Sequence, residues 1–452
     1  MSDRKIFLFS FLFLLLVGIV AVIIVVRESH LFSKEEEPIF ISYVGLWDPD
    51  IINPLKVEFQ RQNPDVTIEY EQKNPELYFE TLKNLIASET TPDIFWWHSG
   101  WGPLLKNDLA SLPEDILSSE KYKETYYPVT EGDAKIGGSF RGIPLEVDGL
   151  ALIYNKKLFA EKKFKKPPKT WSELERVYVP ALNIYVKKKG LVRPAIALGT
   201  ANNISNFSEI LGLMFLQNGA KFVQSNDISL NKSISIEGEN LGQKALKFYS
   251  DFVPQVWDRA RPNSIRAFSK GEVAMIILSA NKLSSLQSQI KATGNKVKFE
   301  VANVPQPPEV TPVTWGSYWL SGVSQKSFYQ RESWEFIKFL GEPENLRKIF
   351  NKEKEFRGIG RPYPRIDMET ELRSDKLLSP YVAQAKFAKS WYIHSGTNDR
   401  SLNDEMVTEL GEMITRLAQG RGSPRTALGG FAAAAKEIAA KYGVLDPDII
   451  ER

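Results

Sequence analysis

Between residues 38 and 98 the sequence alternates between segments typical of buried strands and segments typical of amphipathic helices. Segments 39–47, 66–72 and 93–97 are rich in β-branched and aromatic residues, as strands are. The stretches between them open with Asp-Pro or Asn-Pro and then carry apolar residues at helical spacing. Strand, helix, strand, helix, strand is the order of a parallel sheet with helices on its faces. The sequence therefore predicts an α/β fold.

Aromatic and short polar residues follow the first and third predicted strands. Trp47 and Asp48 follow the first strand, and the segment 96–101 with its three tryptophans follows the third. Ligands of such sheets bind outside the carboxyl ends of the strands, so both groups are expected on one rim. We interpret these rings as part of a ligand floor, although a tryptophan near a strand end more often packs in the core.

A second α/β region is predicted after residue 140. Residues 141–159 form two apolar stretches about Glu146 and Asp148, which predicts one long strand that crosses between two lobes. A threonine-capped helix is expected near 170–182, and strands are expected at 193–199, 273–278 and 296–304. A polar turn follows at residues 279–281, and the chain from Ser333 onwards is predicted to be mostly helical.

The first 37 residues predict a membrane anchor and a tether. Residues 6–26 form an uncharged run, and this run is long enough to cross a bilayer as a helix. Arg4 and Lys5 precede this run, so the N-terminus is expected in the cytoplasm and the rest of the chain outside. A cleavable secretory signal is the alternative, but "AVIIVVRESH" offers no good small-x-small cleavage site.

Composition excludes several classes of function. The formal net charge of +3 has no large block of one sign, which gives no reason to expect nucleic acid as a partner. The densest basic run, residues 162–169, is interpreted as a solvated helix end and loop. Cysteine is absent and the three histidines have no ligand spacing, so neither disulfides nor a metal are expected.

An enzyme is not expected. Glu146 and Asp148 are a conceivable carboxylate pair for glycoside hydrolysis, but side chains two apart on a strand lie about 7 Å apart on one face, and no second acidic cluster is recognisable. The sequence also has neither a G-x-S-x-G elbow nor a phosphate loop.

Several short motifs occur in one order, and together they resemble a known family. They are "TPDIFWWHSGW", "GIPLEVDGLALIYNKKLF", "PPKTWSEL", "FSKGEVAMIILSAN", "VPQPP", "SWEFIKFL" and "GRGSPRTALGGFAAAAKEI". Over roughly residues 38–445 the chain resembles the family 1 extracellular solute-binding proteins, the maltose-binding-protein-like components of bacterial ABC importers. The resemblance implies a two-lobed periplasmic-binding-protein-like α/β fold with hinge strands, here preceded by one transmembrane helix. The expected division is 1–37 as anchor and tether, 38–147 plus 305–360 as the first lobe, and 148–304 plus 361–452 as the second.

The resemblance also implies a ligand site between the lobes. Together with the strand-end and hinge residues that the sequence singles out, the expected ligand-binding residues are Trp47, Asp48, Trp97, His98, Ser99, Trp101, Glu146, Asp148, Ser279, Asn281, Trp315, Tyr318, Trp391 and Tyr392. Indole faces cover the apolar C–H faces of a sugar, and the polar side chains bond its hydroxyls. "HSGW" stands where many family members carry an acidic or arginine pair, so the resemblance does not define which sugar.

The function implied is that of the extracytoplasmic solute-binding component of an ABC importer. Its partners would be a sugar or oligosaccharide and the permease subunits, with no cofactor, no catalytic residue and a monomeric state. Its location would be the outer face of a bacterial cytoplasmic membrane. One alternative is a different ligand, namely a peptide, a polyamine or a phosphate ester, and another is a sensor role. Arg357, Arg361 and Arg365 leave the phosphate ester open.

Overall fold

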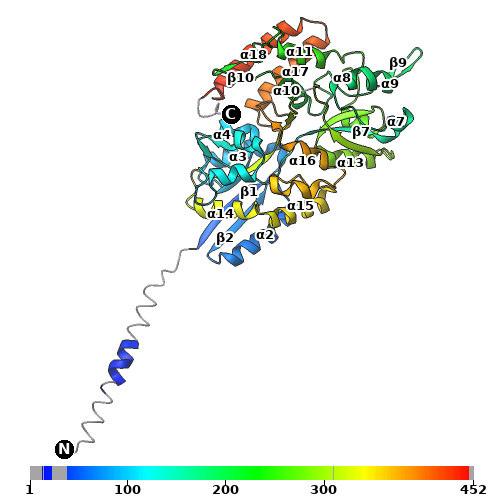
Figure 1. Cartoon of the computed structure of the whole chain (residues 1–452). Coiled ribbons are helices and arrows are strands. Elements are labelled where there is room, and N and C mark those ends of the chain that lie inside the picture. The colour runs from blue at the N-terminus through cyan, green and yellow to red at the C-terminus, as the bar shows by residue number, and fades with distance from the viewer. Residues whose placement is uncertain (1–12, 14, 23–37, 309, 447–452) are drawn as a thin grey trace, which may run out of the picture.

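The computed structural model describes residues 13, 15–22, 38–308 and 310–446, which form two lobes in contact after a short N-terminal helical stretch (Figure 1). Most of the predicted anchor, residues 6–26, lies outside the described residues. Its described part, residues 13 and 15–22, is helical and exposed. Within the described residues, no helix combines the length and the apolar character that a membrane crossing needs.

The first lobe is built on a sheet of order β2-β1-β3-β15-β6. Its strands are β1 (Ile39–Gly45), β2 (Val66–Gln72), β3 (Ile94–His98), β15 (Trp319–Val323) and β6 (Ile143–Pro144). β1 runs parallel to both β2 and β3, while β15 runs antiparallel to β3 and β6. The parallel β-α-β-α-β unit predicted from residues 38–98 is therefore confirmed.

Helices cover this sheet with their apolar faces. α2 (Pro49–Gln62) begins where the Asp48 side chain accepts the Asp50 N–H, and it buries Ile52, Leu55 and Phe59. The other elements of the lobe are η1 (Pro75–Leu77), α3 (Tyr78–Ala87), η2 (Ser99–Trp101), α4 (Gly102–Leu105), α5 (Ser119–Thr125), α6 (Pro128–Ala134), β4 (Lys135–Ile136), β5 (Ser139–Phe140), α14 (Gln330–Leu340) and α15 (Pro343–Arg357). α15 packs on α2, and α14 packs on α2 and β15, so the chain returns to the first lobe late in the sequence.

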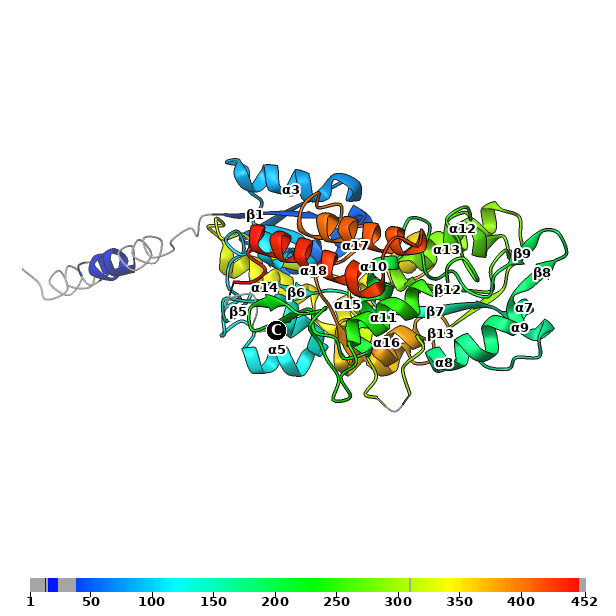
Figure 2. The ribbon, with the colours of Figure 1, turned by 90° about the horizontal axis from the view of Figure 1, so that it is seen from above.

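The second lobe is built on a three-stranded antiparallel sheet, β12 (Met275–Ser279), β7 (Leu150–Asn155) and β13 (Phe299–Asn303). Its helices are α7 (Lys156–Glu161), α8 (Trp171–Glu173), η3 (Leu174–Tyr178), α9 (Val179–Leu182), α10 (Phe207–Gln217), α11 (Leu241–Ser250), α12 (Ser264–Ser269), η4 (Ala280–Lys282) and α13 (Leu283–Ala292). Two hairpins, β8 (Ile184–Val186) with β9 (Gly190–Arg193) and β10 (Val223–Gln224) with β11 (Asp227–Ile228), extend from it. η5 (Ile366–Leu372) packs on α5 and α16 (Ser379–Ala385), and α17 (Leu402–Ala418) and α18 (Pro424–Lys441) pack on α11 (Figure 2).

The prediction of one long strand over 141–159 is wrong, because the chain makes two strands in two different sheets. β6 ends at Pro144 and β7 begins at Leu150. Between them the Val147 N–H donates to Pro362 O at 3.0 Å instead of to a sheet neighbour. The predicted strand at 193–199 is also wrong beyond Arg193, where β9 ends. Pro194 has no N–H, and the Ala195 N–H is taken by the Asn183 side chain, so a single bridge between Ile196 and Met275 remains.

Three segments cross between the lobes, namely 145–149, 313–318 with β14 (Thr314–Trp315), and 373–378 between η5, which packs on α5 of the first lobe, and α16, which packs on β7 and β13 of the second. β14 pairs with β16 (Ala388–Lys389). The first two crossings touch where Gly149 forms an isolated bridge with Gly316. A Cβ at Gly149 would lie 2.8 Å from Trp315 O, so glycine is needed for this close approach.

Candidate functional site

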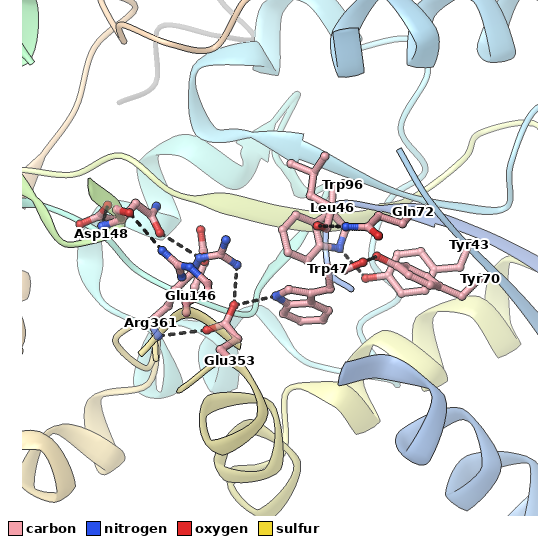
Figure 3. Close-up of polar contacts among 12 residues, drawn as sticks. Tyr43, Leu46, Trp47, Tyr70, Gln72, Trp96, Glu146, Asp148, Glu353 and Arg361 are labelled. Atoms are coloured by element: carbon pink, nitrogen blue, oxygen red, sulfur yellow. Dashed lines mark hydrogen bonds and ion pairs between the residues drawn. The ribbon is translucent and has the colours of Figure 1, made fainter. Parts of the chain in front are cut away.

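Charged and polar side chains are buried together where the lobes meet (Figure 3). Arg361, from the segment between α15 and η5, lies between Glu146 of the first crossing and Glu353 of α15. Its Nε is 2.7 Å from Glu146 Oε2, and its Nη1 is 2.6 Å from Glu353 Oε1. The same Nε donates to Asn281 Oδ1 of the second lobe at 2.8 Å. We call Glu146, Asp148, Asn281, Glu353 and Arg361 the junction cluster.

Asp148 joins the first crossing to the second lobe through backbone N–H groups. It accepts hydrogen bonds from Gly149 N at 2.7 Å, Ala280 N at 2.7 Å and Asn281 N at 3.0 Å. Burial raises its pKa to about 6, although these bonds act in the opposite direction. Burial likewise raises the pKa of Glu146 to about 7, against the effect of Arg361. The cluster therefore holds carboxyl groups that titrate near neutral pH.

Trp47 is bound into the same cluster rather than open to a ligand. Its Nε1 donates to Glu353 Oε1 at 3.0 Å, and its ring packs edge-on against Trp96 with centroids 4.5 Å apart (Figure 3). The ring is 2% exposed. Asp48, which is half-buried, caps α2. Both of these expected ligand-binding residues therefore have a structural partner.

The tryptophans of β3 and η2 lie in the core of the first lobe, which differs from the predicted open floor. Trp97 is buried. A Cβ added to Gly142 would lie 2.7 Å from Trp97 Nε1, and a Cβ added to Gly322 would lie 2.9 Å from the same atom. Trp101 packs against Tyr78 of α3 and edge-on against Trp319 of β15, with centroids 6.1 Å and 5.0 Å apart. β15 pairs directly with β3, so its side chains cover rings that would otherwise stand at a sheet edge.

His98 lies at the end of β3 against a segment that packs with the second lobe. Its Nε2 is 3.2 Å from Ser317 Oγ, and its Nδ1 accepts the Gly100 N–H at 3.1 Å. Its ring lies 4.7 Å from that of His394, centroid to centroid. Burial lowers the pKa of His98 to about 3, so the ring is neutral near pH 7. Asn403 adds a further contact, because its Nδ2 donates to Gly100 O at 2.9 Å.

The remaining expected residues of this region hold the second crossing in place. The Trp315 Nε1 is 3.4 Å from His394 Nδ1, and Ser99 Oγ accepts the Tyr318 N–H at 3.4 Å. The Tyr318 hydroxyl donates to Asp133 Oδ2 of α6 at 2.8 Å.

Ser279, at the end of β12, is buried, and its N–H donates to Asn206 Oδ1 at 3.4 Å.

A cavity of about 440 Å³ lies between the lobes, and two of the expected ligand-binding residues, Trp391 and Tyr392, line it. The first lobe contributes the face of α6, and the second contributes the end of α10 and the start of β10. Trp391 stacks on Phe222, with centroids 4.3 Å apart and planes 17° apart. The lining residues are Pro128, Val129, Gly132, Asp133, Leu216, Phe222, Val223, Ala388, Lys389, Ser390, Trp391, Tyr392 and Val444. A mostly apolar cavity of this size with a few polar groups suits a small organic ligand.

The polar groups of this cavity are well oriented. Asp133 is buried on α6, and it accepts hydrogen bonds from the Tyr318 hydroxyl at 2.8 Å and from Ser390 Oγ at 2.5 Å. The described residues contain no group of three or more His, Cys, Asp or Glu side chains that is suited to a metal ion.

Sequence reasoning did not assign Glu353 or Asp133 to the site, and it considered Arg361 only for a phosphate ligand. Glu353 and Asp133 lie inside helices, where a carboxylate is usually a solvated surface group. The motif "GIGRP" around Arg361 sits between a helix and a proline, which indicates a turn but not the partner of Glu146.

Comparison with known proteins gives one family and several relatives. The family described as "Bacterial extracellular solute-binding protein" matches residues 55–357, about two thirds of the chain. A binding protein of Brucella abortus is 22% identical over 396 residues, which cover 86% of this chain and 89% of that protein. The maltotriose-binding protein of Pyrococcus abyssi is 25% identical over 308 residues, 66% of this chain and 61% of that protein.

Solved structures show the same fold. The cyclic α-maltosyl-1,6-maltose binding protein of Arthrobacter globiformis superimposes with a TM-score of 0.70 at 19% identity, covering 89% of this chain and 100% of that chain. A sugar-binding protein of Xanthomonas citri superimposes with a TM-score of 0.71 at 20% identity, covering 89% and 98%. These likenesses confirm the two-lobed α/β fold expected from the sequence.

Proposed function

Because the chain belongs to the bacterial extracellular solute-binding proteins, we propose that it binds a sugar or oligosaccharide for an ABC importer. Two kinds of observation support the sugar. The maltotriose-binding relative and the sugar-binding structural neighbours share its sequence pattern or fold. The cavity between the lobes also combines aromatic surface with oriented polar groups.

The observation that carries the proposal is the cavity that both lobes line. Trp391, Tyr392 and Phe222 offer aromatic surface for the C–H face of a sugar ring, and Asp133 offers carboxylate oxygens for its hydroxyls. Lys389 and Ser390 lie beside them. We therefore propose Trp391 and Tyr392 as ligand contacts. The other twelve residues expected from the sequence would act by shaping the lobes and their junction.

Binding would favour the closed arrangement of the lobes. Contacts that a ligand makes with α6 and with Trp391 at the same time exist only when the lobes are together, so they shift the population towards the closed form. The junction cluster contributes to the same arrangement, because Asp148 of the first crossing and Arg361 after α15 both bond to η4 of the second lobe. In this proposal the closed form is what permease subunits recognise.

We further propose that the chain works outside the cytoplasm as a monomer without catalytic activity, held to the membrane by residues 6–26. The uncharged sequence of that run and the basic residues before it support the anchor. Mass spectrometry of the native protein tests this point. A mature N-terminus beyond Val26 would contradict it.

Titration of the full chain with maltose and linear maltooligosaccharides tests the sugar proposal. A bound sugar at a hundredfold excess over its dissociation constant stabilises the protein by about 2.7 kcal/mol, which a thermal shift detects. Trp391→Ala should weaken binding at least about tenfold, because a sugar–indole contact and its burial are lost. Trp257→Phe, in the core of the second lobe, is the matched control and should leave binding unchanged. Equal affinity in Trp391→Ala and the wild type would remove the proposed contact.

A phosphate ester is the second candidate ligand. Arg357 Nη1 is buried without a hydrogen-bond partner among the described residues, which favours a nearby anionic group. Arg361, in contrast, is neutralised by two glutamates. Glycerophosphodiesters in the same titration separate the two candidates. Stabilisation by these compounds and none by the sugars would replace the sugar proposal.

A further inference from the structure

The far end of the second lobe carries a basic surface on two neighbouring segments. The β8–β9 hairpin and the segment after α7 lie at the end of the molecule opposite to the start of β1 (Figures 1 and 2). Arg193 of β9 is 3.6 Å from Glu161 of α7, which ties the two segments together. The exposed lysines on them are Lys162, Lys163, Lys165 and Lys166 after α7, and Lys187, Lys188 and Lys189 at the hairpin tip. We call these seven lysines the basic end.

The lysines of the basic end are not used inside the protein. None of them forms an ion pair with another residue of the described chain. Lysines elsewhere do pair, for example Lys244 with Glu239 and Lys247 with Asp251. The seven charges of the basic end are therefore available to an external partner.

Backbone geometry does not account for lysine at two of these positions. Lys163 and Lys188 have φ values of 59° and 71°, in the left-handed region that favours glycine or asparagine. The other described residues in this region that are not glycine are mostly asparagines: they are Asn206, Asn226 and Asn398, with Ser225 and Arg400. At the basic end, Lys163 and Lys188 therefore occupy positions where the backbone conformation favours glycine or asparagine.

Apolar side chains are exposed on the same hairpin. Tyr185 is 63% exposed, Val186 43% and Val192 39%, and they flank the three lysines of the tip. Exposed aromatic and aliphatic side chains beside lysines suit the boundary between lipid headgroups and acyl chains. A purely electrostatic partner, such as an acidic protein loop, would not need them.

We propose that the basic end binds an anionic phospholipid surface. Lysines near such a surface are attracted to its headgroups, and the hairpin side chains enter the interface. The chain leaves the proposed membrane tether at Pro38, next to β1, so a second contact at the opposite end would lay the long axis of both lobes along the membrane (Figure 2). This inference is independent of the ligand, so its failure leaves the sugar proposal intact.

A single fluorescent label on the hairpin tests the contact. The chain has no cysteine, so Val192→Cys in the full chain accepts an environment-sensitive fluorophore at one site. The protein is reconstituted in vesicles of phosphatidylcholine alone, or of phosphatidylcholine and phosphatidylglycerol in equal parts. We expect a blue shift of the label in the anionic vesicles and none in the neutral ones, and we expect high salt to reverse it. A label at Val57→Cys, exposed on α2 of the first lobe, should not shift in either case.

Lysine variants test whether membrane contact depends on the charges at the hairpin tip or only on the net charge of the protein. Replacement of Lys187, Lys188 and Lys189 by Gln should lower the fraction of contacting hairpins at least about tenfold, and replacement by Arg should retain it. The matched control changes Lys354, Lys376 and Lys386 to Gln, which alters net charge equally at exposed positions elsewhere and should have no effect. An unshifted hairpin label in anionic vesicles, or equal contact in the Gln variant, would overturn the proposal. A shift with polyglutamate but not with anionic vesicles would also overturn it, in favour of an acidic protein.

Discussion

The segment around β3 and the segment around Trp391 are both places where tryptophan stands beside short polar residues, yet they lie in different surroundings. Trp97 and Trp101 are enclosed by α3, β15 and closely approaching glycines. Trp391 stacks on one aromatic partner, and a cavity adjoins it. The two segments thus share a composition but differ in what covers them.

The difference shows what makes an aromatic segment available to a ligand. β3 is an inner strand, because β15 pairs along its other edge and adds Trp319 to the cover. The Trp391 segment follows β16, a two-residue strand paired only with β14 among the described strands. A ring beside an inner strand packs in the core, whereas Trp391, beyond a short strand, lines a cavity between the lobes although it is only 6% exposed.

The largest expected effect is on stability, from Trp97→Ala. Removal of a fully buried indole costs about 3–5 kcal/mol, because it leaves a cavity that the neighbouring glycines cannot fill. Chemical denaturation measures this loss. Sugar affinity of the molecules that remain folded should be unchanged, and a selective loss of affinity at wild-type stability would make Trp97 a ligand residue after all.

Arg361→Ala tests whether the junction cluster is structural in the same sense. The change leaves Glu146 and Glu353 buried without their cation, which costs about 3 kcal/mol or more. Denaturation at pH 8 compares this variant with Arg361→Lys, which keeps the charge and should lose less. If Arg361→Ala were as stable as the wild type, the cluster would be open to solvent or to a ligand.

Gly142→Ala should destabilise the protein by about 1–3 kcal/mol through overpacking against the Trp97 ring. An added Cβ would meet Trp97 Nε1 at 2.7 Å. Gly132→Ala, on α6 beside the cavity, is the control, because a Cβ there meets nothing within 4 Å. Calorimetric melting of the two variants measures the contrast, and equal melting temperatures would mean that the core around Trp97 is loose.

His98→Gln should reduce the loss of stability in acid. In the folded state burial lowers the pKa of His98 to about 3, below the usual value of 6.5. Between these two pH values the unfolded state binds a proton at His98 and the folded state does not. Stability is therefore lost as pH falls below about 6.5, by about 1.4 kcal/mol per pH unit. Glu146 and Asp148 act in the opposite sense between about pH 4 and 7, because burial raises their pKa values. The difference between wild type and variant isolates His98, and parallel curves would contradict its burial.

The order of strands and helices in the first lobe could be predicted because it depends on local patterns. Proline-started helices and β-branched strands appear as expected between residues 38 and 98. The break at 145–149 could not be predicted, since the apolar pattern continues on both sides of it. What stops the strand is the Val147 N–H bond to Pro362, more than two hundred residues away in the chain.

The candidate site could be predicted in outline. Trp47, Glu146, Asp148 and Asn281 do gather at one place, but Glu353 and Arg361 gather with them and take their polar groups. A sequence pattern indicates that a ring or a carboxylate lies near a strand end. It does not tell whether the partner there is a ligand or another part of the chain.

The place of β15 has a consequence for the order in which the protein can fold. His98 of β3 pairs with Trp319 of β15. β3 can therefore complete its pairing only after β15 has been synthesised, and all three strands of the second lobe's sheet are synthesised before β15. A chain secreted from its N-terminus would expose the edge of β3, with its tryptophans, throughout that interval. Cellular chaperones that shield unfinished sheets should therefore matter more for this lobe than for its neighbour.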